Sequence, residues 1–162
     1  MNRVRALVDK VLEFAVVVVM GALVLDVLWQ VFTRFVLQDP SSFTEELARY
    51  LLIWVGLLGA AYAAGKRMHL ALDLLPNKLT GRNARRLEIF VEACAFLFAL
   101  FALVIGGFRL VMVTLVLGQT SAALQIPIGW VYLVIPISGL LIMFYSVYHV
   151  VAGKQPSEEP AT

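Results

Sequence analysis

The sequence predicts an all-α membrane protein with four transmembrane helices and both termini in the cytoplasm. Of its 162 residues, 61% are hydrophobic and only 15% are charged, and the mean hydropathy is +0.88. A soluble domain of this size is typically about half apolar, so lipid must be the solvent of this chain. The apolar residues form continuous runs, unlike the short alternating segments of a membrane β-barrel, and this favours helices.

Four apolar runs are long enough to cross a hydrocarbon core of about 30 Å, which takes roughly 20 residues. They lie at residues 11–37, 47–65, 87–117 and 128–152. The first run follows Arg3, Arg5 and Lys10, as the apolar core of a secretory signal would. It is too long for a signal, contains Asp26 and Arg34, and lacks a clear cleavage site, so we expect a retained helix.

Basic residues indicate the orientation of the chain, because lysine and arginine are enriched in cytoplasmic loops. They gather before the first run, between the second and third runs, and after the fourth. These segments and both termini are therefore expected inside, with a single transmembrane domain at 1–153 and a disordered tail at 154–162. The inner connection, residues 66–86, mixes leucines with basic residues and is interrupted by Pro76, so part of it is expected in the membrane interface.

Asp26 lies near the middle of the first run, where a carboxylate costs about 2.5 to 3.5 kcal/mol unless it is paired, solvated or protonated. Gln30 and Arg34 follow at intervals of four residues, which places all three on one helical face. The stripe is either a proton or ion relay or a polar face buried against another helix. We favour the buried face, because polar side chains also hold membrane helices together.

The start of the second run carries two adjacent carboxylates. Residues 42–45, Ser-Phe-Thr-Glu, have the spacing of a capping box. Glu45 and Glu46 would lie at the positive end of the helix dipole, and Arg49 follows within reach of either. An ordinary helix start explains this pattern, but the second carboxylate exceeds what a cap requires. Docking to an outside partner or to another subunit is therefore an equal alternative, with Glu45, Glu46 and Arg49 as the candidate interface.

Small residues form a ridge on the second helix. Gly56, Ala60 and Ala64 recur at intervals of four, with Gly59 and Ala63 alongside. Such a ridge lets another helix approach closely. It therefore predicts helix packing and no chemistry.

The chain shows no pattern typical of a catalytic, cofactor or metal site. His69 and His149 are the only histidines, whereas a catalytic metal generally takes three protein ligands and haem needs facing imidazoles at depth. Glu92, inside the third run, is expected to need a partner, and Cys94 to be a small buried hydrophobe. Phosphate loops and dinucleotide fingerprints are absent, and the net charge of +2 argues against nucleic-acid binding.

Several short motifs follow one another in order along the chain. They are FTEELARYL at 43–51, WVGLLGAA at 54–61, Met68-His69-Leu70 with Asp73, SAALQIP at 121–127, Trp130-Val131-Tyr132 and Pro136. This ordered set, which covers almost the whole chain, resembles the small membrane subunit of tripartite ATP-independent periplasmic (TRAP) transporters, the DctQ type.

The resemblance implies a sodium-driven secondary transporter in the cytoplasmic membrane of a bacterium or archaeon. A periplasmic binding protein would deliver an organic acid to a large multi-span subunit that holds the substrate and sodium sites. The small subunit would brace that partner within the bilayer and help dock the binding protein, without being an enzyme and without a cofactor. By the same resemblance, Glu45, Glu46 and Arg49 belong to the outer interface, Trp54, Gly56, Gly59 and Ala60 to helix packing, and His69 and Asp73 to an inner interfacial turn.

Two other functions fit parts of the sequence. A dimeric, proton-coupled exporter of the small multidrug type would use a membrane carboxylate in its first helix, which is the position of Asp26. The length of the chain, its long inner connection and the cluster of Glu45, Glu46 and Arg49 disfavour this alternative. A haem- or quinone-binding anchor of a redox enzyme is supported only by the two histidines.

Overall fold

The computed structural model describes residues 2–39, 41–66 and 82–152, and most of these residues are helical. The elements are α1 (Asn2–Phe32), the π-helical η1 (Thr33–Leu37), α2 (Ser42–Gly65), α4 (Arg82–Phe98), the π-helical η3 (Ala99–Gly106), α5 (Gly107–Val116), α6 (Ile128–Tyr132) and α7 (Val134–Ala152). Within the described ranges there is no strand, and one isolated bridge joins Thr120 and Pro127.

In the described ranges, four helical segments are long and apolar enough to cross a membrane, which confirms the predicted all-α fold with four transmembrane helices. They are Arg3–Leu37, Ser42–Gly65, Arg85–Val116 and Ile128–Val151. The first three segments begin earlier than the predicted apolar runs, because polar residues continue the helix beyond the apolar core, and the fourth begins at Ile128 as predicted. Near the start of α1, for example, Arg5 Nε lies 3.6 Å from Asp9 Oδ2, one turn later.

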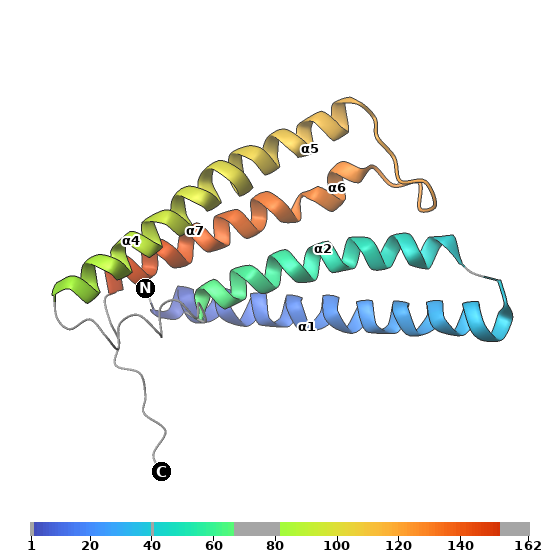
Figure 1. The fold of residues 1–162 in the computed structure, drawn as a ribbon, viewed down its shortest axis with the longest axis horizontal. Coiled ribbons are helices and arrows are strands. Elements are labelled where there is room, and N and C mark those ends of the chain that lie inside the picture. The colour runs from blue at the N-terminus through green and yellow to red at the C-terminus, as the bar shows by residue number, and fades with distance from the viewer. Residues whose placement is uncertain (1, 40, 67–81, 153–162) are drawn as a thin grey trace, which may run out of the picture.

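The helices lie side by side in a layer, in the order α1, α2, α7 and α4 (Figure 1). α1 and α2 are an antiparallel pair, α2 packs against α7, and α7 packs against α4 and η3. The start of α1 and the end of α7 lie at the same end of the layer. We call this the inner end, and the opposite end, where α2 and α6 begin, the outer end. Such an arrangement leaves two broad faces of the layer uncovered.

Many large apolar side chains of the layer are exposed. Phe14 and Phe35 are each 72% exposed, and Leu25 is 70% exposed. Apolar surface of this extent is stable only where lipid or a partner covers it. The expectation of a buried Cys94 is wrong: its side chain is exposed. It lies two residues after buried Glu92, which at 3.6 residues per turn places it on nearly the opposite side of α4.

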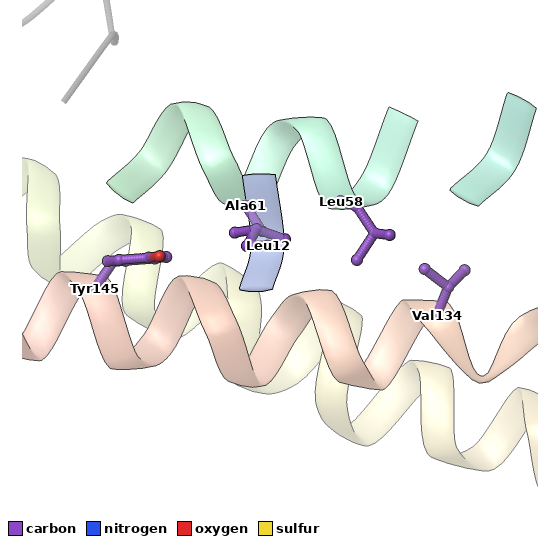
Figure 2. Packing of buried hydrophobic residues seen from close by; sticks show 5 residues of the cluster. All are labelled: Leu12, Leu58, Ala61, Val134 and Tyr145. Atoms are coloured by element: carbon purple, nitrogen blue, oxygen red, sulfur yellow. The ribbon is translucent and has the colours of Figure 1, made fainter. Parts of the chain in front are cut away.

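The buried core lies along the contact between α2 and α7. Leu58 and Ala61 of α2 face Val134 and Tyr145 of α7, and Leu12 of α1 joins them (Figure 2). Ala61 and Val134 are fully buried. The α2–α7 contact therefore joins the two antiparallel helix pairs.

The segment η3–α5 packs closely against α6 and α7, and this close approach depends on glycines of α5, α6 and α7. A Cβ added to Gly107 would lie 2.7 Å from Ile135 Cγ2, and one added to Gly139 would lie 2.8 Å from Leu103 Cβ. At Gly129 the added atom would meet a side chain at 2.5 Å. Since real Cβ atoms avoid such distances, these positions require glycine for the helices to pack as they do.

Candidate functional site

At the outer end, Glu46 holds the loop that connects α5 to α6. Its Oε2 accepts hydrogen bonds from the backbone N–H groups of Ala123, at 2.7 Å, and Leu124, at 3.1 Å. Its Oε1 accepts from the N–H of Ala122 at 3.2 Å and from the hydroxyl of Tyr50 at 2.8 Å. Successive backbone N–H groups that converge in this way form a concave anion site. The carboxylate that fills this site belongs to the chain itself.

The loop is shaped to present these N–H groups. The N–H of Ser121 donates to the carbonyl of Ile126 at 2.9 Å, and the N–H of Ile128 donates to the carbonyl of Gln119 at 3.0 Å, so the loop closes as a tight hairpin. Gln125 has a φ of 56°, in the left-handed region that a sharp turn requires. Three consecutive amides at 122–124 are left outside the hairpin ladder, and Glu46 accepts from each of them.

Glu45 and Arg49 behave differently from Glu46. Arg49 Nη2 lies 3.4 Å from Glu45 Oε1, and the two side chains are 67% to 68% exposed. An exposed ion pair between residues four apart contributes only about 0.3–0.5 kcal/mol, so little stability is lost when it opens. Of the two carboxylates predicted to be within reach of Arg49, the structure pairs it with Glu45. Glu45 and Arg49 are thus the members of the predicted interface that remain accessible.

The prediction of a capping box at 42–45 is wrong, because the helix begins one residue earlier than that box requires. Ser41 occupies the cap position and makes no capping hydrogen bond through its side chain, and Ser42 is the first helical residue. The hydroxyl of Thr44 donates to the carbonyl of Ser41 at 2.9 Å. Glu45 therefore falls outside the capping position and extends toward Arg49.

Trp54 joins α2 to α6. Its indole Nε1–H donates to the carbonyl of Val131 at 3.0 Å. Val131 lies in the last turn of the short helix α6, where carbonyls lack partners within the helix. Pro136, in the first turn of α7, has no N–H to continue the ladder. The hydrogen bond from Trp54 to Val131 thus joins α2 to α6 in the outer half of the layer.

The ridge of Gly56, Gly59 and Ala60 lies outside the packing of this chain. Gly56 and Ala60 are exposed and Gly59 is half-buried. A Cβ added to Gly56 or Gly59 would meet no atom within 4 Å. Ala64, at the inner end of the predicted ridge, is buried, as are Ala61 and Gly65 beside it. No helix in the described ranges packs closely on Gly56 or Gly59, so the packing role of the ridge stays a prediction.

At the inner end, Asp9 and Arg5 of α1 connect three helices. The hydroxyl of Tyr145 donates to Asp9 Oδ1 at 2.6 Å, and Arg5 Nη2 donates to the carbonyl of Gly65 at 3.3 Å. The guanidinium of Arg5 also lies 4.7 Å from the centre of the Tyr148 ring. Sequence reasoning treated Arg5 only as a signal of orientation and missed this cluster. The spacing of four residues between Arg5 and Asp9 was the available signal.

A buried polar contact connects α4 to α7. His149 Nδ1 lies 3.0 Å from Glu92 Oε1, and these residues are 2% and 7% exposed. Glu92 thus has the partner that its position within the third run leads one to expect. Together with the cluster around Asp9, this pair ties all four membrane-crossing segments at the inner end.

The stripe of Asp26, Gln30 and Arg34 is buried only in part. Asp26 is 9% exposed, and its Oδ2 has no hydrogen-bond partner in the described part of the chain. Gln30 is half-buried and Arg34 is exposed. The π-helical segment η1 begins at Thr33, so the four-residue periodicity that places Arg34 on the face of Asp26 no longer holds there.

The described residues do not include the predicted inner turn. His69 and Asp73 lie outside them, as do most of the predicted interfacial connection and the tail at 154–162. Among the residues that the structure describes, no group of three or more His, Cys, Asp or Glu side chains is placed to hold a metal ion.

Comparison with known proteins points to one transporter family. The family model for the DctQ component of tripartite ATP-independent periplasmic transporters matches residues 23–154. The sialic acid TRAP transporter small permease protein SiaQ of Vibrio cholerae is 28% identical, over 83% of this chain and 81% of that protein.

Two further relatives are much longer proteins. The sialic acid TRAP transporter permease protein SiaT of Haemophilus influenzae is 27% identical, over 71% of this chain and 18% of that protein. The isethionate TRAP transporter permease protein DctMQ of Oleidesulfovibrio alaskensis is 34% identical, over 59% of this chain and 15% of that protein.

Proposed function

Because the chain belongs to the DctQ family of small TRAP transporter subunits, we propose that it braces the large permease of a sodium-driven importer of an organic acid. The chain is then a multi-pass membrane protein whose role is structural. Substrate and sodium sites belong to the large permease in this proposal. This assignment is consistent with a layer of helices that has polar ties and no set of metal-ligating side chains in the described ranges.

The observation that carries this proposal is the position of the polar contacts. They join the helices at both ends of the layer, through Glu46 and Trp54 at one end and through Asp9 and Glu92 at the other. The apolar faces between these ends are left open. A brace needs this combination, because its own helices must stay fixed while a partner moves against them.

The proposed partner within the membrane is a large multi-span TRAP permease. In SiaT and DctMQ, a segment similar to this chain is part of a much longer permease protein, which supports close association of the two parts. The exposed ridge of Gly56 and Ala60 offers that partner a place of close helix contact. Gly59, at the edge of the same ridge, would widen the contact.

A periplasmic substrate-binding protein is the proposed partner at the outer end. The exposed pair of Glu45 and Arg49 lies beside the loop that Glu46 fixes. The inner end carries Arg3, Arg5 and Lys10, so by the positive-inside rule it faces the cytoplasm. The outer end then faces the periplasm of a bacterium, where a binding protein can reach it.

The class of substrate is inferred from the named relatives. SiaQ and SiaT are named for sialic acid and DctMQ for isethionate, and both compounds are organic acids. We therefore propose an organic acid for this transporter as well. Sodium coupling is part of the same proposal.

The test is uptake of a radiolabelled acid into proteoliposomes with and without a sodium gradient. Five samples are compared: this chain alone, the large permease alone, the large permease with the binding protein, both membrane subunits together, and both together with the binding protein. Sodium-dependent uptake only in the complete combination supports the proposal. Full uptake by the large permease and binding protein without this chain contradicts it, and proton-coupled export by this chain alone would instead support the exporter that uses Asp26.

A further inference from the structure

A groove of about 390 Å³ lies between α4 and α7, close to the inner end. Its walls include Ile89, Ala93, Phe96 and Leu97 from α4 and Val147 and Val150 from α7. The surface it presents is apolar, and both helices belong to segments long and apolar enough to cross a membrane. An occupant of this groove is therefore apolar and enters from the hydrocarbon region of the membrane.

The polar residues near the groove do not alter its apolar character. Glu92 and Ser146 also border it, but they are only 7% and 4% exposed. The carboxylate of Glu92 is directed to His149, with 3.0 Å between Oε1 and Nδ1. Glu92 and His149 thus contact each other across the helix interface. The groove therefore offers an occupant mainly carbon atoms.

Two arginines mark the inner end of the groove. Arg85 and Arg86 precede Ile89 by four and three residues, which places them on the groove-lining face of α4, one turn nearer the end of the helix. Arg85 Nη2 donates to the carbonyl of Val150 at 2.9 Å and so crosses from α4 to α7. Arg86 is exposed. The groove is thus apolar along its length and basic at one end.

The two arginines lie at the depth of lipid headgroups. The third apolar run begins at Leu87, directly after the two arginines, so their guanidinium groups fall at the end of the run that crosses the membrane, while the groove extends along it. Basic side chains between transmembrane helices at the cytoplasmic side are suited to anionic headgroups. Apolar length and a basic end match the two parts of a phospholipid in position and in charge.

We propose that this groove binds one acyl chain of an anionic phospholipid, with its phosphate at Arg86 and Arg85. The lipid would fill the space between α4 and α7 and add contacts beyond the one between Glu92 and His149. The site would be a structural lipid site and does not depend on which acid is transported.

The experiment measures lipid retained by the full chain after dilution from detergent, by native mass spectrometry. The probes are phosphatidylglycerol and phosphatidylcholine with the same acyl chains. Ala93→Phe fills the groove, and Arg86→Gln removes a charge from an exposed position that the fold does not need. The matched controls are Ala102→Phe and Arg109→Gln, at exposed positions of the same segment away from the groove.

Wild type is expected to retain phosphatidylglycerol in preference to phosphatidylcholine. Arg86→Gln should weaken retention about fivefold, the effect of one basic residue near an anionic lipid. Ala93→Phe should abolish retention of both lipids, while the two controls keep the wild-type pattern. Equal retention of the two lipids by wild type, or wild-type retention by either groove variant, overturns the proposal. Photocrosslinking from position 93 to the large permease, with no lipid retained, also overturns it and identifies a protein interface.

Discussion

The carboxylate of Glu46 accepts a hydrogen bond from the backbone N–H of Ala123 at 2.7 Å, although 77 residues separate the two positions. This contact ties the beginning of α2 to the loop between α5 and α6. Glu45, the preceding residue, pairs instead with Arg49 on its own helix. Two adjacent carboxylates therefore have different roles, and mutation can separate them.

Glu46→Ala is expected to loosen the 119–127 loop while the four membrane-crossing helices remain folded. The three amides at 122–124 would lose their common acceptor, and water would replace it. Hydrogen exchange followed by mass spectrometry should show much faster exchange at 122–124 and unchanged exchange in α2 beyond its first turn. Glu45→Ala is the matched control, and faster exchange of the loop in that variant would contradict the separation of roles.

Replacement of Arg49 with glutamine should leave the subunit as stable as wild type, to within about 0.5 kcal/mol, because the pair with Glu45 is exposed. If the pair contacts the binding protein, uptake should require a higher concentration of that protein. Uptake is therefore measured over a range of binding-protein concentrations for Arg49→Gln, Glu45→Gln and wild type. Identical curves for the three proteins would exclude the proposed docking role.

Trp54→Phe should lower the unfolding free energy by about 0.5–1.5 kcal/mol, the typical contribution of one hydrogen bond. The substitution keeps an aromatic ring but removes the Nε1–H that donates to Val131. Thermal unfolding of the detergent-solubilised subunit measures the change. Trp130→Phe, at a position that is 62% exposed, controls for the loss of an indole, and an equal effect of both substitutions would count against the hydrogen bond.

The position of the membrane-crossing helices was predictable from the sequence, because a run of apolar residues is a local signal. The face on which a helix packs was less accessible. Gly56 and Ala60 form a regular ridge, but this ridge is exposed. Gly107 and Gly139 lack such a pattern, yet an added Cβ at either would meet a neighbouring side chain within 3 Å. Close approach depends on both helices, and a single sequence shows only one of them at a time.

The contact partners of the polar residues were likewise hard to predict from the sequence. Glu46 binds backbone N–H groups. Every residue except proline carries such a group, so the residue types in the sequence do not indicate which segment Glu46 contacts. The pair of Glu92 and His149 was more accessible, since a carboxylate inside an apolar run needs a partner. That this partner is His149 is evident only from the structure, in which the inner ends of α4 and α7 lie together.

The two sets of glycines should respond oppositely to mutation. Gly139→Ala places a Cβ 2.8 Å from Leu103 Cβ and should destabilise the subunit by about 1–3 kcal/mol through overpacking. Gly56→Leu should leave the isolated subunit intact but reduce the amount of large permease that co-purifies with it. Thermal unfolding and co-purification are measured for both variants. Normal co-purification with Gly56→Leu would show that the partner does not pack on this ridge.

Asp26→Asn should retain most sodium-driven uptake. The carboxamide has nearly the same shape as the carboxyl group, and a buried side chain whose Oδ2 has no hydrogen-bond partner in the described residues loses little when that oxygen is replaced. Uptake and the yield of the assembled complex are measured together, with Asp26→Leu as the variant that removes polarity altogether. Loss of uptake in Asp26→Asn with normal assembly would show that the carboxylate takes part in transport as a proton or ion relay, because asparagine can pack in its place but cannot ionise.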